Sequence, residues 1–313
     1  MAYVAPKYIV RSATNLKEAA DLWWPLMQEL GWNRGQADAA THFKAAENGK
    51  NWLLICSQPL NTPRGMVMPL TYPNKTGWVA FFIMTDGYRG EGLGRQLWKE
   101  MELRFKDAET DIIGLDAVQE QVETYKRRGF VSCATIPIMM REPLADKPLE
   151  VTWGYEDSPE LQDLRDVDPM YLAQFDLDHT GLDRSAYWVQ DGLPSRRHTS
   201  GFAIIENGQL TGLIYARRCP DGVRVGPLYA ANYLHAKQLL SKLMNDYARM
   251  NGTFVAEVFG SNELGVQVFE ELGWKYANIT YHRMWLHGKV PVQQQGGGLG
   301  AKRMYAILDA ACG

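Results

Sequence analysis

The sequence is organised around the stretch Gly77–Met101, which reads GWVAFFIMTDGYRGEGLGRQLWKEM. Its first part, 78–84, is a continuous apolar run that predicts a buried strand, and residues 93–101 carry apolar side chains at helical spacing. A strand, a glycine-rich turn and a helix in this order favour phosphate binding, because glycines let bare backbone N–H groups approach an anion at a helix N-terminus. An ordinary tight connection between strand and helix is the alternative, and this stretch alone leaves both open.

Length and composition limit what the protein can be. The chain has 313 residues, a length typical of about two domains, and its 46% hydrophobic and 22% charged residues are typical of a globular protein. A net charge of −3 argues against a nucleic-acid partner. Its four cysteines lie far apart and fit no metal or redox spacing, so we expect no metal site.

The apolar runs also bear on localisation. None approaches the roughly 20 residues of a membrane span, and the N-terminal stretch lacks the apolar core of a signal peptide. We therefore expect a soluble, cytoplasmic protein with no membrane partner.

Hydrophobic periodicity divides the first half into short segments of alternating type. We expect strands at 8–13, 52–57, 65–72, 78–84, 112–118 and 130–140, and helices at 16–30, 36–47, 93–106 and 120–128. Asn15 and Glu18 form a capping-box pattern, and His42 is expected on a helix surface or at a cleft edge. This order predicts an α/β protein with a mixed sheet and helices on both faces, because a strand–helix–strand crossover pairs its strands in parallel.

The second half repeats the order of the first. A hairpin at Asn207-Gly208 precedes a strand, a helix, a strand, a helix ending at Gly273 and a closing strand. The proline-bearing segment 142–150 reads as a linker, so we expect domains at 1–145 and 150–313. We expect residues 293–298, QQQGGG, to form a flexible link, and 302–310 to dock as a last strand.

Two motifs resemble the GNAT superfamily of acyl-CoA N-acyltransferases. Residues Arg89–Gly94, RGEGLG, fit its R/Q-x-x-G-x-G/A signature, and Tyr125–Phe130, YKRRGF, fit its Y-x-x-x-G-F pattern. The family often has an Asn where this chain has Val118. The second half lacks the phosphate signature and resembles the degenerate C-terminal GNAT-like domain of tandem acetyltransferases, including the D-x-x-x-x-G-x-D-R pattern at 176–184. The resemblance therefore implies two tandem GNAT folds, with the cofactor bound by the first.

This resemblance also implies site residues. Acetyl-CoA would be the co-substrate, and no metal is implied. The cofactor-binding positions are Ile83, Met84, Arg89, Gly90, Glu91, Gly92, Leu93, Gly94 and Arg95. Strands parting after Ile83-Met84 would free backbone groups for the pantetheine arm and the thioester oxygen.

Catalytic roles follow from the same resemblance. Tyr125 would protonate the departing CoA thiolate as a general acid, although an aromatic side chain packed on a helix face is the alternative. Asp86, Asp116 and Glu120 are the carboxylates considered for the base, with Asp116 and Glu120 favoured, and a water chain could serve instead.

Acidic and aromatic side chains are the candidates for binding an amine. They are Trp23, Asp86, Asp176, Asp178, His179 and Glu257. Each acid could instead be solvated or belong to a structural pair such as Asp183–Arg184. The favoured function is transfer of an acetyl group, by direct attack in a ternary complex, to a primary amine of a small molecule: an amino sugar, an aminoglycoside-like amine, a polyamine or an amino acid. Acetylation of a protein lysine or N-terminus and non-catalytic acyl-CoA sensing are the alternatives. Homodimerisation stays open.

Overall fold

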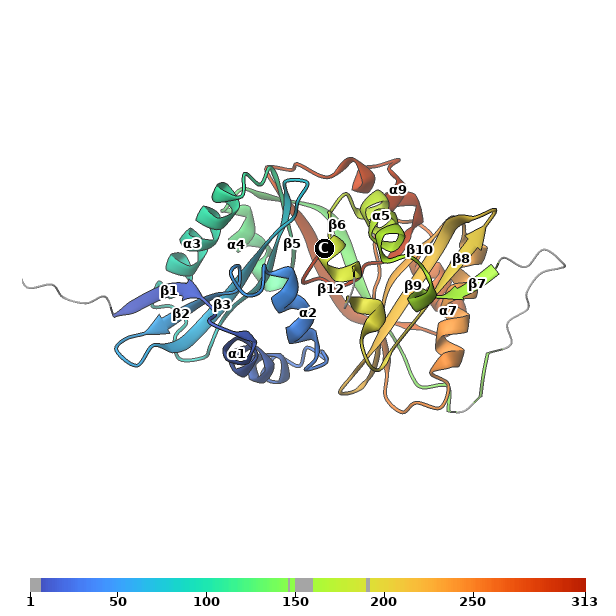
Figure 1. Ribbon diagram of the computed structural model, residues 1–313, viewed down its shortest axis with the longest axis horizontal. Helices are drawn as coiled ribbons and strands as arrows, with labels where there is room; N and C mark the ends of the chain where they lie inside the picture. Colours follow the sequence, from blue (N-terminus) through green and yellow to red (C-terminus); the bar gives the residue numbers. More distant parts are fainter. Residues whose placement is uncertain (1–6, 146, 150–159, 190–191) are drawn as a thin grey trace, which may run out of the picture. The chain divides into compact units, whose positions relative to one another are not determined.

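The computed structural model describes residues 7–145, 147–149, 160–189 and 192–313 (Figure 1). These residues form a mixed α/β protein, as the sequence predicted. The chain divides into two compact units: unit 1 is Met1–Ile113 with Cys312, and unit 2 is Gly114–Ala311 with Gly313.

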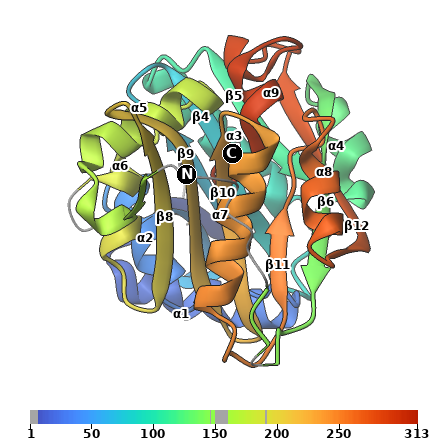
Figure 2. The same ribbon diagram turned by 90° about the vertical axis from the view of Figure 1, so that its right-hand side faces the viewer.

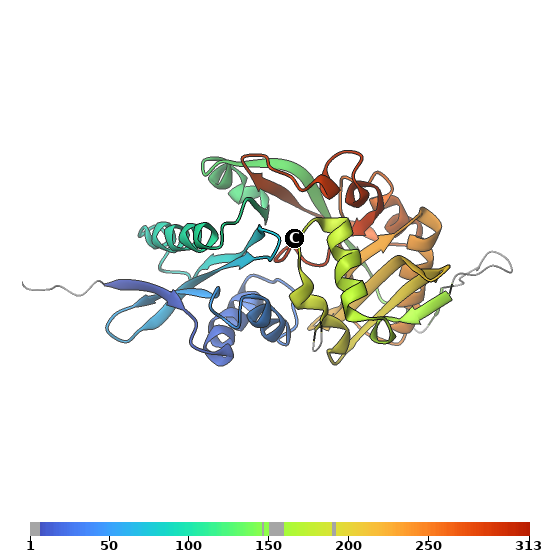
Figure 3. The same cartoon turned by 45° about the horizontal axis from the view of Figure 1, so that its top comes forward.

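Unit 1 contains an antiparallel sheet in the order β1-β2-β3-β4. Its strands are β1 (Tyr8–Ser12), β2 (Leu53–Ser57), β3 (Thr62–Thr71) and β4 (Thr76–Met84). Its helices are α1 (Leu16–Glu29), α2 (Asp38–Ala45) and α3 (Leu93–Asp107). Figure 3 shows α3 on one face of this sheet and α1 with α2 on the other. The sheet therefore carries helices on both faces, as expected.

The start of α1 shows how local sequence fixes these elements. Asn15 caps the helix by accepting a 2.9 Å bond from the backbone N–H of Glu18. The Glu18 carboxylate accepts from the backbone N–H of Thr14 at 2.8 Å and pairs with Arg11 at 2.6 Å. The hydrogen bond from Arg11 lowers the pKa of Glu18 to about 2. The expected N-cap at Asn15 is therefore present, whereas Glu18 accepts from Thr14 and not from Asn15 as a complete capping box would require.

A bulge interrupts β4 near its end. The pairing with β3 passes from Met68↔Ala80 to Met66↔Ile83, so two residues of β4 oppose one residue of β3. One of them, Phe81, has a positive φ of 47°, which is unusual for an aromatic residue and costs on the order of 1–3 kcal/mol. The bulge therefore changes the direction of β4 just before the glycine-rich turn.

Unit 2 contains a mixed sheet in the order β5-β12-β6-β11-β10-β9-β8-β7, with β13 also paired to β10. Its strands are β5 (Ile112–Ala117, from Gly114 on), β6 (Phe130–Arg141), β7 (Glu160–Asp163), β8 (Thr199–Glu206), β9 (Gln209–Cys219), β10 (Gly222–Ala230), β11 (Phe254–Glu257), β12 (Lys275–Leu286) and β13 (Met304–Ala306). Its helices are α4 (Val122–Lys126), α5 (Pro169–Thr180), α6 (Ser185–Trp188), α7 (Tyr233–Asp246), α8 (Gly265–Glu271) and α9 (Leu299–Arg303), with short 3₁₀ turns η1 (Gln119–Gln121), η2 (Leu164–Asp166), η3 (Leu193–Ser195) and η4 (Val292–Gln294). Figure 2 shows α7 running along the face formed by β8, β9 and β10.

The two halves of the sequence repeat exchange strands inside unit 2. Strand β12, from the second half, lies between β5 and β6 of the first and is antiparallel to both. Strand β6 in turn pairs antiparallel with β11 of the second half. The sheet of unit 2 is therefore built from strands of both halves of the sequence, alternating where β5, β12, β6 and β11 lie side by side.

The segment 293–298 is not the flexible link that its composition suggested. Gln294 is 6% exposed, accepts a 3.0 Å bond from Arg283 and donates a 2.7 Å bond to the carbonyl of Thr180. A buried amide with both ends bonded holds the backbone in place, which the low-complexity composition could not reveal. A last strand does follow it, but β13 spans only Met304–Ala306 of the expected 302–310, and residues 302 and 303 end α9.

Candidate active site

The glycine-rich turn between β4 and α3 is set by backbone conformation. Gly87, Gly90 and Gly92 have φ of 79°, 83° and 79°, and a Cβ on any of them would meet no atom of the described chain within 4 Å. Glycine is required here because of the left-handed conformation, not because of crowding. Since space beside these residues is open, a ligand can approach the backbone directly.

The start of α3 presents unbonded amides. Gly92 is the N-cap and supplies no side-chain hydrogen bond. Within the described residues, the amides of Gly90, Glu91 and Gly92 donate to no backbone carbonyl. Successive free N–H groups at a helix N-terminus attract an anion. Buried Leu93 anchors the first turn of the helix beneath them, and Gly94 follows it.

Charged side chains surround this turn. Arg89 pairs with Asp86 at 2.9 Å, and the two side chains are 57% and 69% exposed. The Arg89 Nε–H donates to the carbonyl of Met84 at 3.3 Å, and Arg95 is exposed in the first turn of α3. The exposed Asp86–Arg89 pair opens at little cost, so Arg89 is available to a phosphate. Asp86 is the partner of Arg89, not an isolated acceptor for an amine.

An aromatic cluster packs against the bulge in β4. The Phe81 ring lies 5.7 Å from Trp23 and 5.2 Å from His42, and the Arg34 guanidinium lies 5.2 Å from the same ring. Trp23 is fully buried, and its Nε1–H has no hydrogen-bond partner among the residues that the structure describes. His42 is only 4% exposed, so its expected surface position is wrong: the neighbouring aromatic rings cover it.

Tyr125 lies on the short helix α4 and is half-buried. Burial raises the pKa of Tyr125 to about 12, and Arg128 opposes this shift. Its ring lies 6.1 Å from that of Phe130. The phenol is therefore protonated at neutral pH, which is the state that a proton donor needs. Glu120, on the preceding turn η1, is exposed.

Asp116 is part of a buried ion pair. Both of its carboxylate oxygens accept from Arg283, at 2.9 and 2.7 Å, and both side chains are fully buried. Burial raises the pKa of Asp116, and the Arg283 guanidinium opposes this rise. Its expected role as a base is corrected, because a carboxylate bound at both oxygens by arginine is occupied. Arg283 lies 167 positions away, so no spacing along the chain indicates this pair.

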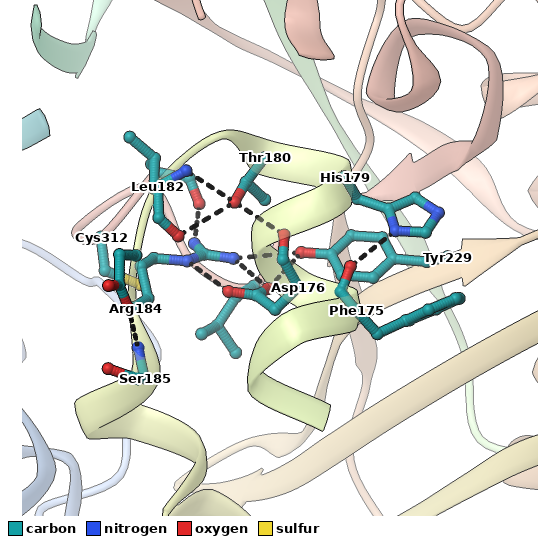
Figure 4. Close-up of polar contacts among 12 residues, drawn as sticks. Phe175, Asp176, His179, Thr180, Leu182, Arg184, Ser185, Tyr229 and Cys312 are labelled. Atoms are coloured by element: carbon teal, nitrogen blue, oxygen red, sulfur yellow. Dashed lines mark hydrogen bonds and ion pairs between the residues drawn. The ribbon is translucent and has the colours of Figure 1, made fainter. Parts of the chain in front are cut away.

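A second buried network lies in unit 2 (Figure 4). Asp176 binds Arg184 through both oxygens, at 3.0 and 2.6 Å, and accepts from the hydroxyl of Tyr229 at 2.8 Å. Arg184 also donates to the carbonyl of Gly313. The side chains of Asp176 and Arg184 are 0% exposed. Asp176 therefore does not attract an amine from solvent, and this expectation is corrected.

The other candidate acceptor residues are dispersed. His179 stacks on Tyr229 with ring centroids 4.7 Å apart, and its Nδ1 lies 2.7 Å from the carbonyl of Phe175, while burial lowers the pKa of His179 (Figure 4). Asp178 is exposed on the surface of α5. Glu257 is 3% exposed and pairs with Arg224, so its expected position facing a cleft is wrong.

The described residues hold no group of three or more His, Cys, Asp or Glu side chains that could bind a metal ion. Nor does any helix among them combine the length and apolar character that a membrane span needs.

Comparison with known proteins identifies the family. Residues 61–138 and residues 172–296 each match a family described as an acetyltransferase (GNAT) domain. The holothin acyltransferase of Pseudoalteromonas sp. (strain SANK 73390) is 26% identical over 214 residues, which cover 67% of each chain.

Solved structures share the fold. A putative acetyltransferase from Pyrococcus horikoshii has a TM-score of 0.73 at 19% identity and covers 100% of this chain and 98% of its own. A tandem GNAT protein from the clavulanic acid biosynthesis pathway has a TM-score of 0.60 at 14% identity, covering 89% of this chain and 98% of its own. These likenesses establish a tandem GNAT fold. The chain belongs to the GNAT family and is an acyltransferase with two GNAT domains in tandem.

Proposed function

We propose that this protein transfers an acetyl group from acetyl-CoA to a primary amine of a small molecule. The observation that carries the proposal is the open N-terminus of α3, where the amides of Gly90, Glu91 and Gly92 have no backbone acceptor in the described chain. An acyl-CoA carries a pyrophosphate, which is the ligand that such a row of N–H donors favours.

Each element of this turn has a role in the proposal. The backbone amides of 90–94 bind the pyrophosphate, and Arg89 and Arg95 add charged donors. Arg89 leaves its exposed partner Asp86 to do so. Backbone groups of Ile83 and Met84, at the end of β4, bind the pantetheine arm. We propose the functional division 1–145 for cofactor and chemistry and 150–313 for support and acceptor shaping.

The proton transfers fall to two groups. Tyr125, protonated because its pKa is raised to about 12, donates to the departing thiolate. The amine must lose a proton before or during its attack on the thioester. Asp116 is held by Arg283, so exposed Glu120 or a water chain takes that proton.

A thermal-shift titration tests cofactor binding. We expect saturating acetyl-CoA to raise the Tm of the wild type, and Gly92→Val to abolish the shift, because valine resists a φ of 79° and covers the adjacent amides. Gly208→Val is the matched control: its φ is 75°, a Cβ there meets nothing within 4 Å, and it lies in the hairpin between β8 and β9. No shift in the wild type would contradict the proposal.

A turnover assay tests the acceptor. Release of free CoA thiol is measured with small amines, with holothin because a relative is named for it, and with peptides bearing a free N-terminus or lysine. We expect turnover with at least one small amine. Turnover with peptides alone would favour a protein acetyltransferase, and binding without turnover would favour an acyl-CoA sensor.

A further inference from the structure

Strands β10 and β11 are paired over only part of their length. They run parallel and pair from Val223↔Phe254 to Val225↔Ala256. Directly after this, β10 bulges between Val225 and Leu228, and Gly226 has a φ of 153°. The two strands part beyond the bulge, which leaves main-chain groups on both sides of a gap.

Strand β13 occupies this gap. On one side it pairs antiparallel with β10, through Leu228↔Ala306 and Tyr229↔Met304. On the other side Ala306 bridges to Val258, and the amide of Ile307 donates to the carbonyl of Glu257 at 2.9 Å. The segment is thus bonded to both parted strands.

The fit of this segment is close. Residues 304–307 are all at most 1% exposed. A Cβ on Gly226 would lie 2.2 Å from the carbonyl oxygen of Ile307, so only glycine allows the chain to pass there. The gap therefore has no room for a second extended chain while β13 is in place.

Side chains from neighbouring elements hold the segment at several points. Asn262 donates to the carbonyl of Met304 at 3.2 Å, and Arg217 pairs with Asp309 in a buried contact. Glu257 accepts from the backbone N–H of Ala310 at 2.7 Å. Glu257, which the sequence suggested as a residue that binds the amine, instead holds the segment that fills the gap.

We propose that residues 304–309 are a permanent occupant of the gap between β10 and β11, and that the second GNAT repeat consequently takes up no acyl-CoA. The GNAT resemblance implies that the pantetheine arm enters between parted central strands, and here the chain's own backbone takes those hydrogen bonds. One acyl-CoA per chain is the result. This count rests on the proposed function, because acetyl-CoA is the probe.

Isothermal titration of the full chain with acetyl-CoA tests the count. We expect one site in the wild type and none in Gly92→Val. Two sites in the wild type, or one remaining in Gly92→Val, would overturn the inference. No binding in the wild type would instead contradict the proposed function, and the exchange measurement below then decides the inference without acetyl-CoA.

Hydrogen exchange tests the occupant directly. We expect the amides of Ile307 and Phe259, which face Glu257 and Tyr305, to exchange slowly with and without acetyl-CoA. Asp309→Asn weakens the pair with Arg217 and should speed exchange across 304–309 at least tenfold, whereas Asp178→Asn, an exposed control, should not. Fast exchange in the wild type, or exchange accelerated by acetyl-CoA, would overturn the inference.

Discussion

The two strand-to-helix connections of the repeat differ in whether the chain itself supplies hydrogen-bond acceptors for the N–H groups at the start of the helix. Between β4 and α3, Gly92 leads the helix without a side-chain cap. Between β10 and α7, Asn232 accepts a 2.9 Å bond from the backbone N–H of His235, and Ala231 donates to the carbonyl of Thr211 at 2.8 Å. The same fold therefore leaves its amides open in one repeat and bonds them internally in the other. Under the proposed function, acyl-CoA binding therefore depends on this loop and not on the fold alone.

The ion pairs of the repeats differ in the same sense. Asp86–Arg89 in the first connection is exposed on both sides, whereas Asp176–Arg184 in the second half is fully buried. An exposed pair can exchange its partner for a ligand, while a buried pair is fixed by the cost of leaving either charge alone.

The largest effect should come from splitting the buried pair. Asp176→Asn should lower the free energy of unfolding by about 3–5 kcal/mol, because Arg184 remains buried without its counter-charge. Urea denaturation measures this. Asp86→Asn is the exposed counterpart and should change it by less than about 1 kcal/mol. Equal losses of unfolding free energy in the two variants would contradict the distinction between a buried and an exposed ion pair.

A smaller effect, on rate alone, should come from Tyr125. Tyr125→Phe should lower kcat by about 100-fold while acetyl-CoA binding is unchanged, and Tyr276→Phe, an exposed control, should leave kcat unchanged. Because the acid form persists below its raised pKa of about 12, activity should not fall through loss of this proton between pH 8 and about 11. A Tyr125-dependent fall in activity near pH 9 would contradict the assignment.

The smallest effect should come from the cap of α7. Asn232→Ala should destabilise the protein by about 1 kcal/mol, since the amide of His235 loses its acceptor. The number of acetyl-CoA sites should stay at one, because β13 still fills the second repeat. A second site in this variant would show that the cap alone excludes the cofactor.

Local signals made much of the fold predictable. The cap at Asn15, the apolar run of β4 and the glycines of the turn act over a few residues, and the structure has the helix, strand and loop where they indicated. The tandem GNAT assignment is likewise confirmed.

The environment of the acidic residues was not predictable in this way. Asp116 meets Arg283 because β12 pairs with β5, and buried His42 packs against the rings of Phe81 and Trp23. Such residues are far apart in the sequence and meet through the topology of the fold, so the local spacing of residues does not indicate them. The sequence also could not show that 304–309 fills a gap in the sheet.

The strand exchange in unit 2 has a consequence for synthesis. Strand β6 ends at Arg141, but its partner β12 begins at Lys275, so about 130 further residues must be made first. At roughly 5–20 residues per second this is on the order of 10 s, during which β6 leaves the ribosome with both edges unpaired. Unpaired strand edges invite contact with other chains. We therefore expect the nascent chain to be prone to aggregation during the time between the synthesis of β6 and that of β12.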